Sequence, residues 1–261
     1  MSDPAITFSK AITRRPSACV TRGLRSKDAG DPDFLQLERD HYEYVGALKD
    51  AGANVVELDP LDNLPDSVFV EDTALCLPDC AILMRPGAES RRPEVAPIAD
   101  DIRKIFRTVF EISGPGFIEG GDILYTGREI LVGASERTDH AGIAELAEFV
   151  EPRGYHVRPV ETPPGVLHFK TDCSLVGTDT ILSTQRLAAS GCFSDYTMLI
   201  VPEGEEAAAN MIRLNNTLIM SVGFPKTADM LLTQGFNVVQ LNNCECAKID
   251  GGMSCLSLRI A

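Results

Sequence analysis

A helix, a strand, a loop and a β-hairpin follow one another repeatedly along this chain, at a spacing of roughly 50 residues. Apolar residues at helical spacing, bounded by proline or glycine, predict helices at about 32–52, 94–106, 141–149, 205–209 and 225–234. Apolar and β-branched runs between turn residues predict strands at 18–20, 54–58, 67–77, 81–84, 108–112, 123–126, 129–132, 156–159, 172–177, 180–183, 197–201, 210–213, 217–221, 237–241 and 255–260. A period of this length is typical of radial or solenoid repeats.

The repeat predicts a single α/β domain over residues 1–261. No proline- or serine-rich linker and no block of like charge divides the chain, so we expect no second domain. Five ββαβ units around a pseudo-five-fold axis would form a five-bladed α/β propeller. Loops from several units meet at the central channel of such a ring, so residues far apart in sequence can share one site.

Acidic residues outnumber basic ones by 38 to 24, which gives a formal net charge of −14. Nucleic acids and anionic membranes favour basic surfaces, so neither is an expected partner. Solubility alone explains the charge, although an acidic cleft would also attract a small cationic substrate. The sequence shows no apolar leader segment and no stretch long enough to span a bilayer, which predicts a cytoplasmic protein.

The chain has eight cysteines, which we expect to be free thiols in a reduced compartment. Two pairs have imperfect metal-binding spacing and lack a second pair of ligands, so no metal is predicted: Cys76 with Cys80, and Cys244 with Cys246. Cys255 has a more specific setting, because it follows a Gly251-Gly252 turn at the mouth of the expected last strand. Glycines permit unusual backbone conformations, so this turn could present the thiol as a nucleophile. The alternative is an ordinary buried cysteine.

Two loops carry acidic residues beside apolar strands. Asp66, Glu71 and Asp72 lie close together in the first, and Glu119 and Asp122 flank a Gly-Gly pair in the second. Carboxylates placed in this way could bind a cationic substrate or orient a histidine. The alternatives are a solvated turn for the first loop and a simple hairpin turn for the second.

His168 lies between apolar residues just before an expected strand, whereas the other three histidines have more polar surroundings. Alone it would most simply be a structural residue, but with a cysteine elsewhere it becomes a candidate general acid/base. Arg91 and Arg137 lie in or beside loops, and guanidinium groups suit carboxylates, with surface charge as the alternative. Together these groups fit a zwitterionic substrate with a guanidinium or amidine at one end and an amino acid at the other.

The order and spacing of these motifs resemble the dimethylarginine dimethylaminohydrolase family, within the guanidine-modifying pentein superfamily. The resemblance covers nearly the whole chain, and its most specific stretches are 65–72, 85–88, 90–92, 119–122, 126–129, 135–138, 167–168 and 250–255. The Gly-Gly pair before Cys255 is glycine-richer than in mammalian members and leans toward bacterial members and arginine deiminases. The deiminase run His-Leu-Asp reads His168-Phe169-Lys170 here.

This resemblance implies a five-fold propeller of ββαβ units, in agreement with the repeat. It also implies Cys255 as nucleophile, His168 as general acid/base and Glu119 as the acidic partner that binds the guanidinium. Further residues would surround the substrate: the acids Asp66, Glu71 and Asp72, the arginines Arg91 and Arg137 toward its carboxylate, and backbone groups of Leu24 and Ile249.

The implied reaction is hydrolysis of an Nω-methylated arginine to citrulline and a methylamine, through a covalent S-alkylthiouronium intermediate on Cys255. It requires no cofactor and no metal, and its partner is the small-molecule substrate, while a homodimer is compatible with it. Arginine deiminase, agmatine deiminase and amidinotransfer are alternatives, although agmatine lacks the carboxylate that Arg91 and Arg137 would bind. A non-catalytic arginine- or zinc-binding protein on the same scaffold is a further alternative, against which the intact Cys255, His168 and Glu119 argue.

Overall fold

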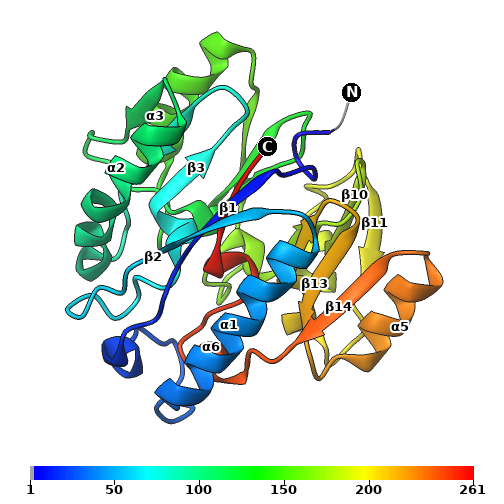
Figure 1. Ribbon diagram of the computed structural model, residues 1–261. Coiled ribbons are helices and arrows are strands. Elements are labelled where there is room, and N and C mark those ends of the chain that lie inside the picture. The colour runs from blue at the N-terminus through cyan, green and yellow to red at the C-terminus, as the bar shows by residue number, and fades with distance from the viewer. Residues whose placement is uncertain (1–2) are drawn as a thin grey trace.

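Five three-stranded sheets surround a common axis in the computed structural model, which describes residues 3–261 (Figure 1). The first strands of the sheets are β3 (Ala74–Cys76), β6 (Ile123–Tyr125), β9 (Cys173–Leu175), β12 (Ile212–Leu214) and β15 (Leu258–Ile260). The middle strands are β4 (Ala81–Leu83), β7 (Ile130–Ala134), β10 (Thr180–Ser183), β13 (Thr217–Ser221) and β1 (Lys10–Arg14). The third strands are β5 (Val109–Glu111), β8 (Val157–Glu161), β11 (Thr197–Ile200), β14 (Asn237–Leu241) and β2 (Asn54–Leu58). The predicted five-bladed α/β propeller is confirmed.

All five sheets have the same pairing, in which the middle strand is antiparallel to the first strand and parallel to the third. A parallel neighbour requires a crossover connection, which is commonly a helix. The crossovers here contain α1 (Phe34–Asp50), α2 (Val95–Ile105), α3 (His140–Val150), α4 (Gln185–Ala188) and α5 (Pro225–Thr233). Figure 1 shows α2, α3 and α5 on the outside of the molecule, which leaves the axis to the turns before the first strands.

The two ends of the chain close the ring. Strand β15, near the C-terminus, pairs antiparallel with β1, near the N-terminus, and Leu258 lies opposite Ile12. Both of these side chains are buried. Figure 1 shows the red C-terminal segment beside the blue β1 in the middle of the molecule. Because Cys255 comes three residues before β15, closure of the ring also positions the candidate nucleophile.

A short 3₁₀ turn precedes the first strand of every sheet: η2 (Val70–Thr73), η4 (Gly120–Asp122), η6 (Phe169–Thr171), η7 (Glu206–Ala209) and η8 (Ser254–Leu256). Turn η2 contacts η4 and η8, and η6 contacts η4 and η7. The circle is completed by Asn210, which follows η7 and accepts a hydrogen bond of 2.9 Å from the backbone N–H of Ser254 in η8. Most of the predicted site residues lie on or beside this ring of turns.

Three predicted strands are wrong, and all three involve buried 3₁₀ turns. Residues 18–20 belong to the turn η1 (Ala18–Arg22), residues 67–73 precede β3 rather than extending it, and the last strand begins at Leu258 rather than at 255. These apolar runs are buried in turns, and a short apolar run cannot be assigned to a strand by its burial pattern alone. Strand β1 and the short helices α4 and α6 (Cys244–Ala247) were not predicted, and the expected helix at 205–209 is the turn η7.

Helix α1 supports the turn that carries Cys255. Its side chains Leu37, Tyr44 and Leu48 recur at helical spacing on one buried face, and they belong to the same apolar cluster as Met253 and Leu256. The helix begins after Asp33, whose carboxylate accepts a hydrogen bond of 3.1 Å from the N–H of Gln36. The predicted helix over 32–52 is therefore confirmed, and its buried face packs beneath the last turn of the ring.

Replacement of Leu37 by alanine tests this packing. Leu37 is fully buried, whereas Leu35 in the same helix is 60% exposed. We expect Leu37→Ala to lower the free energy of unfolding by about 2–5 kcal/mol, because it removes buried apolar surface and leaves a cavity. The matched control Leu35→Ala should stay within about 0.5 kcal/mol of the parent protein. Urea unfolding followed by circular dichroism measures both values, and equal effects of the two substitutions would contradict the assigned packing.

Candidate active site

Cys255 lies in the middle of the 3₁₀ turn η8 and is buried. The prediction that a strand carries this thiol is therefore wrong, since β15 begins only at Leu258. The preceding glycines are needed for space rather than for unusual backbone angles, because neither has a positive φ. A Cβ at Gly251 would lie 2.4 Å from the Phe69 ring, and a Cβ at Gly252 would lie 2.3 Å from the side chain of Asn210.

Hydrogen bonds from distant elements hold the segment around Cys255. The Tyr44 hydroxyl donates to the Met253 carbonyl at 2.9 Å, and the Asn243 side chain donates to the Gly251 carbonyl at 2.9 Å. Asp250 adopts a φ of +59°, which is rare for a residue other than glycine. Its carboxylate accepts a hydrogen bond of 2.9 Å from the Ser26 hydroxyl, which ties this segment to the loop after Leu24. The nucleophile turn is thus fixed from several sides.

His168 and Glu119 form a buried pair next to this turn. His168 precedes η6, Glu119 precedes η4, and His168 Nε2 lies 2.6 Å from Glu119 Oε2. The other carboxylate oxygen of Glu119 accepts a 3.2 Å hydrogen bond from the Ala88 N–H and lies 3.4 Å from an Arg137 nitrogen. These contacts leave Glu119 completely buried. Such a pair can hold an imidazolium and aim its proton.

The charges around His168 favour its protonated form. Burial opposes the imidazolium, but the carboxylates of Asp72, Asp122 and Glu119 outweigh burial and raise the pKa of His168 from 6.5 to about 9. For Glu119, burial opposes ionisation, but the hydrogen bond and charge of His168 outweigh it and lower the pKa of Glu119 to about 2. At neutral pH this pair is therefore an imidazolium and a carboxylate, which suits His168 to act as a general acid.

Arg91 is buried among acids at the edge of the site. It forms ion pairs with Asp72 and, at 2.8 Å, with Glu94, and it donates to the Phe69 carbonyl at 2.9 Å. Burial opposes the charge of Arg91, but Glu94 and Asp72 outweigh it, so the pKa of Arg91 is well above its usual value. Asp72 in turn accepts a 2.8 Å hydrogen bond from the Gly121 N–H. This network fixes Asp72 beside His168, at 4.0 Å between Asp72 Oδ1 and Nε2.

A pocket joins most of the predicted site residues. Its lining includes Leu24, Asp66, Phe69, Asp72, Arg91, Arg137, Leu167, His168, Ile249, Asp250, Gly251 and Cys255. Asp66 Oδ1 accepts a 2.9 Å hydrogen bond from the Leu24 N–H, and burial raises the pKa of Asp66 even though Arg91 opposes this shift. Acids and arginines thus share a pocket with four apolar side chains, those of Leu24, Phe69, Leu167 and Ile249.

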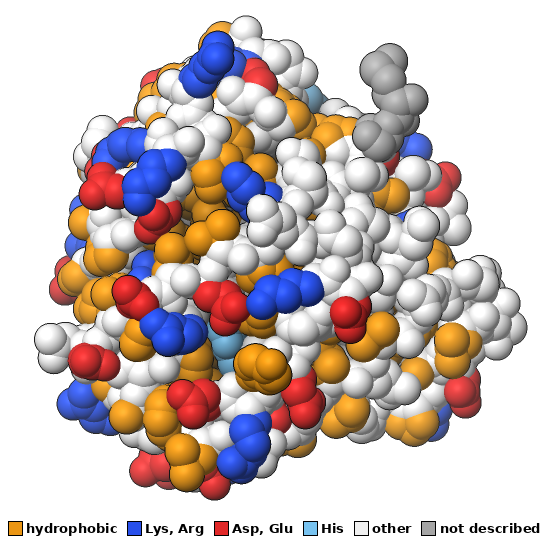
Figure 2. Space-filling view, in the orientation of Figure 1, with side chains coloured by type: hydrophobic (Ala, Val, Ile, Leu, Met, Phe, Trp, Pro, Cys, Tyr) orange, Lys and Arg blue, Asp and Glu red, His pale blue; other side chains and the backbone are white. Residues whose placement is uncertain are grey.

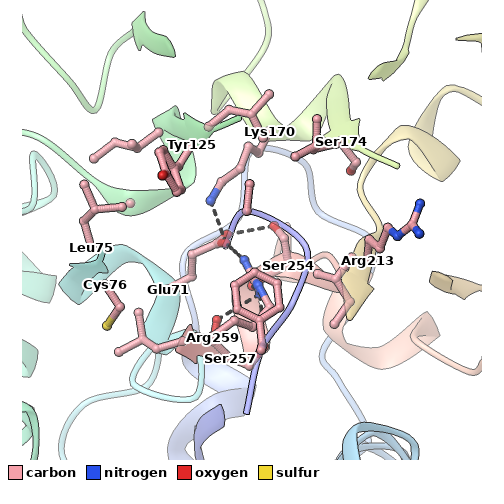
Figure 3. Close-up of a pocket in the computed structure, with 18 of the residues that line it drawn as sticks. Glu71, Leu75, Cys76, Tyr125, Lys170, Ser174, Arg213, Ser254, Ser257 and Arg259 are labelled. Atoms are coloured by element: carbon pink, nitrogen blue, oxygen red, sulfur yellow. Dashed lines mark hydrogen bonds and ion pairs between the residues drawn. The ribbon is translucent and has the colours of Figure 1, made fainter. Parts of the chain in front are cut away.

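Glu71 lines a different cavity, on the other side of the turn ring, with a volume of about 110 Å³. Figure 3 shows Lys170, Ser254 and Arg259 converging on its carboxylate, at 2.6, 2.7 and 2.7 Å. Burial opposes ionisation of Glu71, but the two cations outweigh it and lower its pKa. The sequence predicted Glu71 beside the substrate, whereas the structure places it behind Cys255 in a network with two cations, Lys170 and Arg259.

The Cys255 thiol is protonated in the free protein. Burial raises its pKa, the charges of Glu71 and Asp72 raise it further, and its pKa reaches about 12. The Gly252 N–H, 3.4 Å from Sγ, and the charge of Lys170 act in the opposite direction. A positive charge that entered the pocket would lower this pKa and favour the thiolate.

Three groups at the site have donor atoms that a metal ion could use. The ligand atoms of Asp72, Glu119 and His168 lie within 4.8 Å of one another. However, Asp72 is paired with Arg91, and Glu119 is hydrogen-bonded to His168. An imidazolium has no lone pair to offer a metal. The charge distribution therefore favours a hydrogen-bonded acid–base network at this position.

Several residues around the site were not predicted, namely Phe69, Leu167, Lys170, Asn210 and Ser254. An alignment of the repeats with one another could have found Lys170. Glu71, Lys170 and Cys255 each lie three residues before the first strand of their unit. The position of Asn210 depends on the contact between the fourth and fifth units, for which a single sequence carries no signal.

The surface has acidic and basic side chains interspersed, and Figure 2 shows a histidine in a recess between them. Among the described residues, every helix is too short or too polar to cross a lipid bilayer. These observations add no second candidate site on the face shown.

Comparisons with known proteins agree with the geometry. The family model described as arginine deiminase matches residues 59–192. The N(G),N(G)-dimethylarginine dimethylaminohydrolase of Pseudomonas aeruginosa is 36% identical over 97% of this chain and 99% of its own length. The enzyme of the same name from Streptomyces coelicolor is 34% identical over 96% of each chain.

Solved structures extend this likeness to the fold. A mutant of the Pseudomonas aeruginosa enzyme in complex with citrulline superimposes with a TM-score of 0.94, at 35% identity, over 97% of this chain and 99% of that one. The N-terminal domain of the arginine dihydrolase ArgZ has a TM-score of 0.87 at 20% identity, which shows a shared fold alone. By sequence and by structure, this chain belongs to the dimethylarginine dimethylaminohydrolase family.

Proposed function

We propose that this protein hydrolyses Nω-methylated arginine to citrulline and a methylamine. The observation that carries the proposal is the pocket lined by Cys255, His168, Asp66, Asp72 and Arg137, with the buried Glu119 in contact with His168 and Arg137. These groups match the three parts of such a substrate, which are its guanidinium, its reactive carbon with the leaving amine, and its carboxylate. The family membership supports the same reaction, because the relatives named above carry that activity in their names.

Binding of the cation is the first requirement. Asp66 and Glu119 hold the guanidinium by charge-assisted hydrogen bonds, which are stronger than neutral ones. Arg91 is already saturated by Asp72, Glu94 and backbone carbonyls, so Arg137 is the better candidate for the substrate carboxylate. Backbone groups of Leu24 and Ile249 complete the contacts at the mouth of the pocket.

The guanidinium then activates the nucleophile. Its positive charge lowers the pKa of the Cys255 thiol, the thiol proton passes to solvent, and the thiolate forms a bond to the central guanidinium carbon. The bond from that carbon to the methylated nitrogen breaks, and His168 gives its proton to the departing amine. The remaining species is an S-alkylthiouronium on Cys255. Because a guanidinium is stabilised by resonance, positioning and covalent catalysis must supply much of the barrier reduction.

Hydrolysis completes the cycle. The neutral His168 left by the first step removes a proton from water, and the oxygen attacks the thiouronium carbon. The carbon–sulfur bond breaks, citrulline leaves and the sulfur regains its proton. Glu119 stabilises the imidazolium that forms again on His168. All protons are accounted for by His168, water and the thiol, so the proposed cycle includes no cofactor and no metal.

Arginine deiminase activity is the second candidate, because the matched family model carries that description. The apolar side chains of Phe69 and Leu167 among the pocket residues favour a methylated guanidinium over an unsubstituted one. The single domain over residues 1–261, the cytoplasmic location and the homodimer stay predictions.

Replacement of the nucleophile tests the reaction. Cys255→Ser should reduce citrulline formation below detection and leave the folded state intact, because a serine hydroxyl is a far weaker nucleophile here. Parent and variant are incubated with arginine, mono- and dimethylarginine and agmatine, and the products are identified by mass. The control Cys244→Ser replaces an exposed cysteine and should keep full activity. Citrulline from arginine alone would favour the deiminase, and comparable turnover by Cys255→Ser would exclude this residue as nucleophile.

The charge of Glu119 sets the protonation of His168. Glu119→Gln should lower the pKa of His168 from about 9 by roughly 1–3 units, because an opposite charge in contact is lost. A raised histidine pKa stabilises the folded state below about pH 6.5, and this stabilisation disappears as the pH rises through about 9. The lowered pKa of Glu119 stabilises the folded state above about pH 4.5. The stability difference between parent and variant should therefore be largest between these limits of 4.5 and 6.5.

NMR titration of His168 and urea unfolding at several pH values measure these effects. Glu111→Gln, at an exposed carboxylate on β5, is the control and should leave the His168 titration unchanged. An unaltered pKa of His168 in Glu119→Gln would contradict the pairing.

Arg137 distinguishes substrates that have a carboxylate from those that lack one. Arg137→Ala should raise KM for monomethylarginine about 10- to 100-fold, as expected for loss of a hydrogen bond between charged groups worth ~1.5–3 kcal/mol. The effect on a methylated agmatine, which has no carboxylate, should be small. Steady-state kinetics with both compounds measure the difference, and Arg128→Ala, at a guanidinium over the Tyr196 ring, is the control. An equal rise in KM for the two compounds would show that Arg137 does not bind the substrate carboxylate.

A further inference from the structure

Asn210, which precedes β12 of the fourth unit, reaches the turn η8 through two hydrogen bonds. Its Oδ1 accepts from the Ser254 N–H at 2.9 Å, and its Nδ2 donates to the Ser254 Oγ at 3.2 Å. The side-chain amide therefore binds both the backbone and the side chain of the residue next to Cys255. Ser254 is buried, so these hydrogen bonds are shielded from water.

Asn210 also packs against the other side of the same turn. The side-chain amide lies where a Cβ on Gly252 would be, with its atoms 2.3 to 2.6 Å from that position. The N–H of Gly252 points at Cys255 Sγ, at 3.4 Å, and the Cys255 N–H donates to the Gly252 carbonyl at 3.3 Å. Asn210 thus contacts Gly252 and Ser254, which lie on either side of Met253 just before Cys255.

A second link leads from Ser254 to the network behind the site. Ser254 Oγ donates to Glu71 Oε2 at 2.7 Å, and Glu71 Oε1 accepts from Lys170 and Arg259 (Figure 3). Arg259 returns to the turn, since it donates to the Ser254 carbonyl at 3.1 Å. The N–H, the hydroxyl and the carbonyl of Ser254 are therefore all fixed, from three different units of the ring.

We infer that Asn210 and Ser254 act as positioning residues for catalysis, by holding the Cys255 sulfur against the Gly252 N–H and in line with the guanidinium carbon. This inference rests on the proposed function. Neither residue lines the pocket, so both would act through the position of the turn and not by proton transfer to the substrate. Misplacement of a reacting group by about 1 Å can cost on the order of 100-fold in rate. A turn of three residues has little stiffness of its own, so this placement depends on the side chains that hold it.

Asn210→Ala removes both hydrogen bonds to Ser254 and the packing against Gly252. We expect kcat for dimethylarginine to fall roughly 10- to 100-fold, while KM stays within about threefold, because the residues that bind the substrate are untouched. Asn237→Ala is the matched control, since Asn237 is an exposed asparagine on β14 of the same unit. Rates are expressed per mole of alkylatable Cys255, so a smaller folded fraction does not imitate a lower kcat.

The pH dependence of Cys255 alkylation reports the position of the sulfur directly. Iodoacetamide labelling is followed at Cys255 by peptide mass spectrometry in the absence of substrate. In Asn210→Ala the alkylation midpoint should move to higher pH, because the Gly252 N–H no longer stabilises the thiolate. A residue with a purely structural role would lower Tm and leave this midpoint unchanged in the folded protein.

Ser254 provides an independent pair of variants, which decides the matter should Asn210→Ala not fold. Ser254→Ala removes the hydroxyl that links Asn210 to Glu71 and should show the same loss of kcat and the same shift of the alkylation midpoint. Ser254→Thr keeps the hydroxyl and should recover most of the activity. The inference is overturned if kcat stays within twofold of the parent in the folded alanine variants, or if their alkylation midpoints do not move. If the parent forms no citrulline, the proposed function fails, while the alkylation midpoints still test the placement.

Discussion

The charges buried around the axis determine how this ring of turns can close. Every charged group there has a partner within the protein, because an unpaired charge away from water costs several kcal/mol. Three of the ion pairs join different units of the propeller, namely Glu71 with Lys170, Glu71 with Arg259, and Glu119 with His168. The pairs of Asp72 with Arg91 and of Glu119 with Arg137 lie within one unit each. Each of the five apolar clusters lies between two neighbouring sheets, and the ion pairs between units add polar contacts around the axis.

The two sides of the ring use this charge differently. Behind the turns, the carboxylate of Glu71 is compensated by two cations and a hydroxyl group. In front, Asp66 and Asp72 line the pocket that also holds the thiol of Cys255. A cation that enters this pocket adds the positive charge that the thiolate lacks. The pocket with the thiol therefore lies on one face of the ring, while on the other face Glu71 is already paired with Lys170 and Arg259.

The sequence predicted the five-fold repeat and most pocket residues because both leave local traces. Helical periodicity is strong in helices such as α1, and Glu119 and His168 lie in loops whose composition differs from that of the strands around them. The 3₁₀ turns were missed, since a buried turn of three or four residues has no period to detect. Arg91 shows that a sequence also does not reveal the partner of a charged side chain. A loop arginine suggests a ligand contact, whereas the fold surrounds this one with Asp72 and Glu94. Only the three-dimensional structure shows which charged side chains form ion pairs within the protein and which are left to bind a ligand.

The high pKa of the Cys255 thiol follows from this arrangement and gives the site its selectivity. A thiolate needs a positive charge nearby, but Lys170 and Arg259 are occupied by Glu71, and Arg91 is occupied by Asp72 and Glu94. The resident cations therefore leave the thiol protonated and little reactive toward neutral electrophiles. In the proposed reaction, a guanidinium held by Asp66 and Glu119 brings its charge next to the sulfur and so favours the thiolate on binding. Without a substrate, burial and the negative charges of Glu71 and Asp72 keep the sulfur protonated.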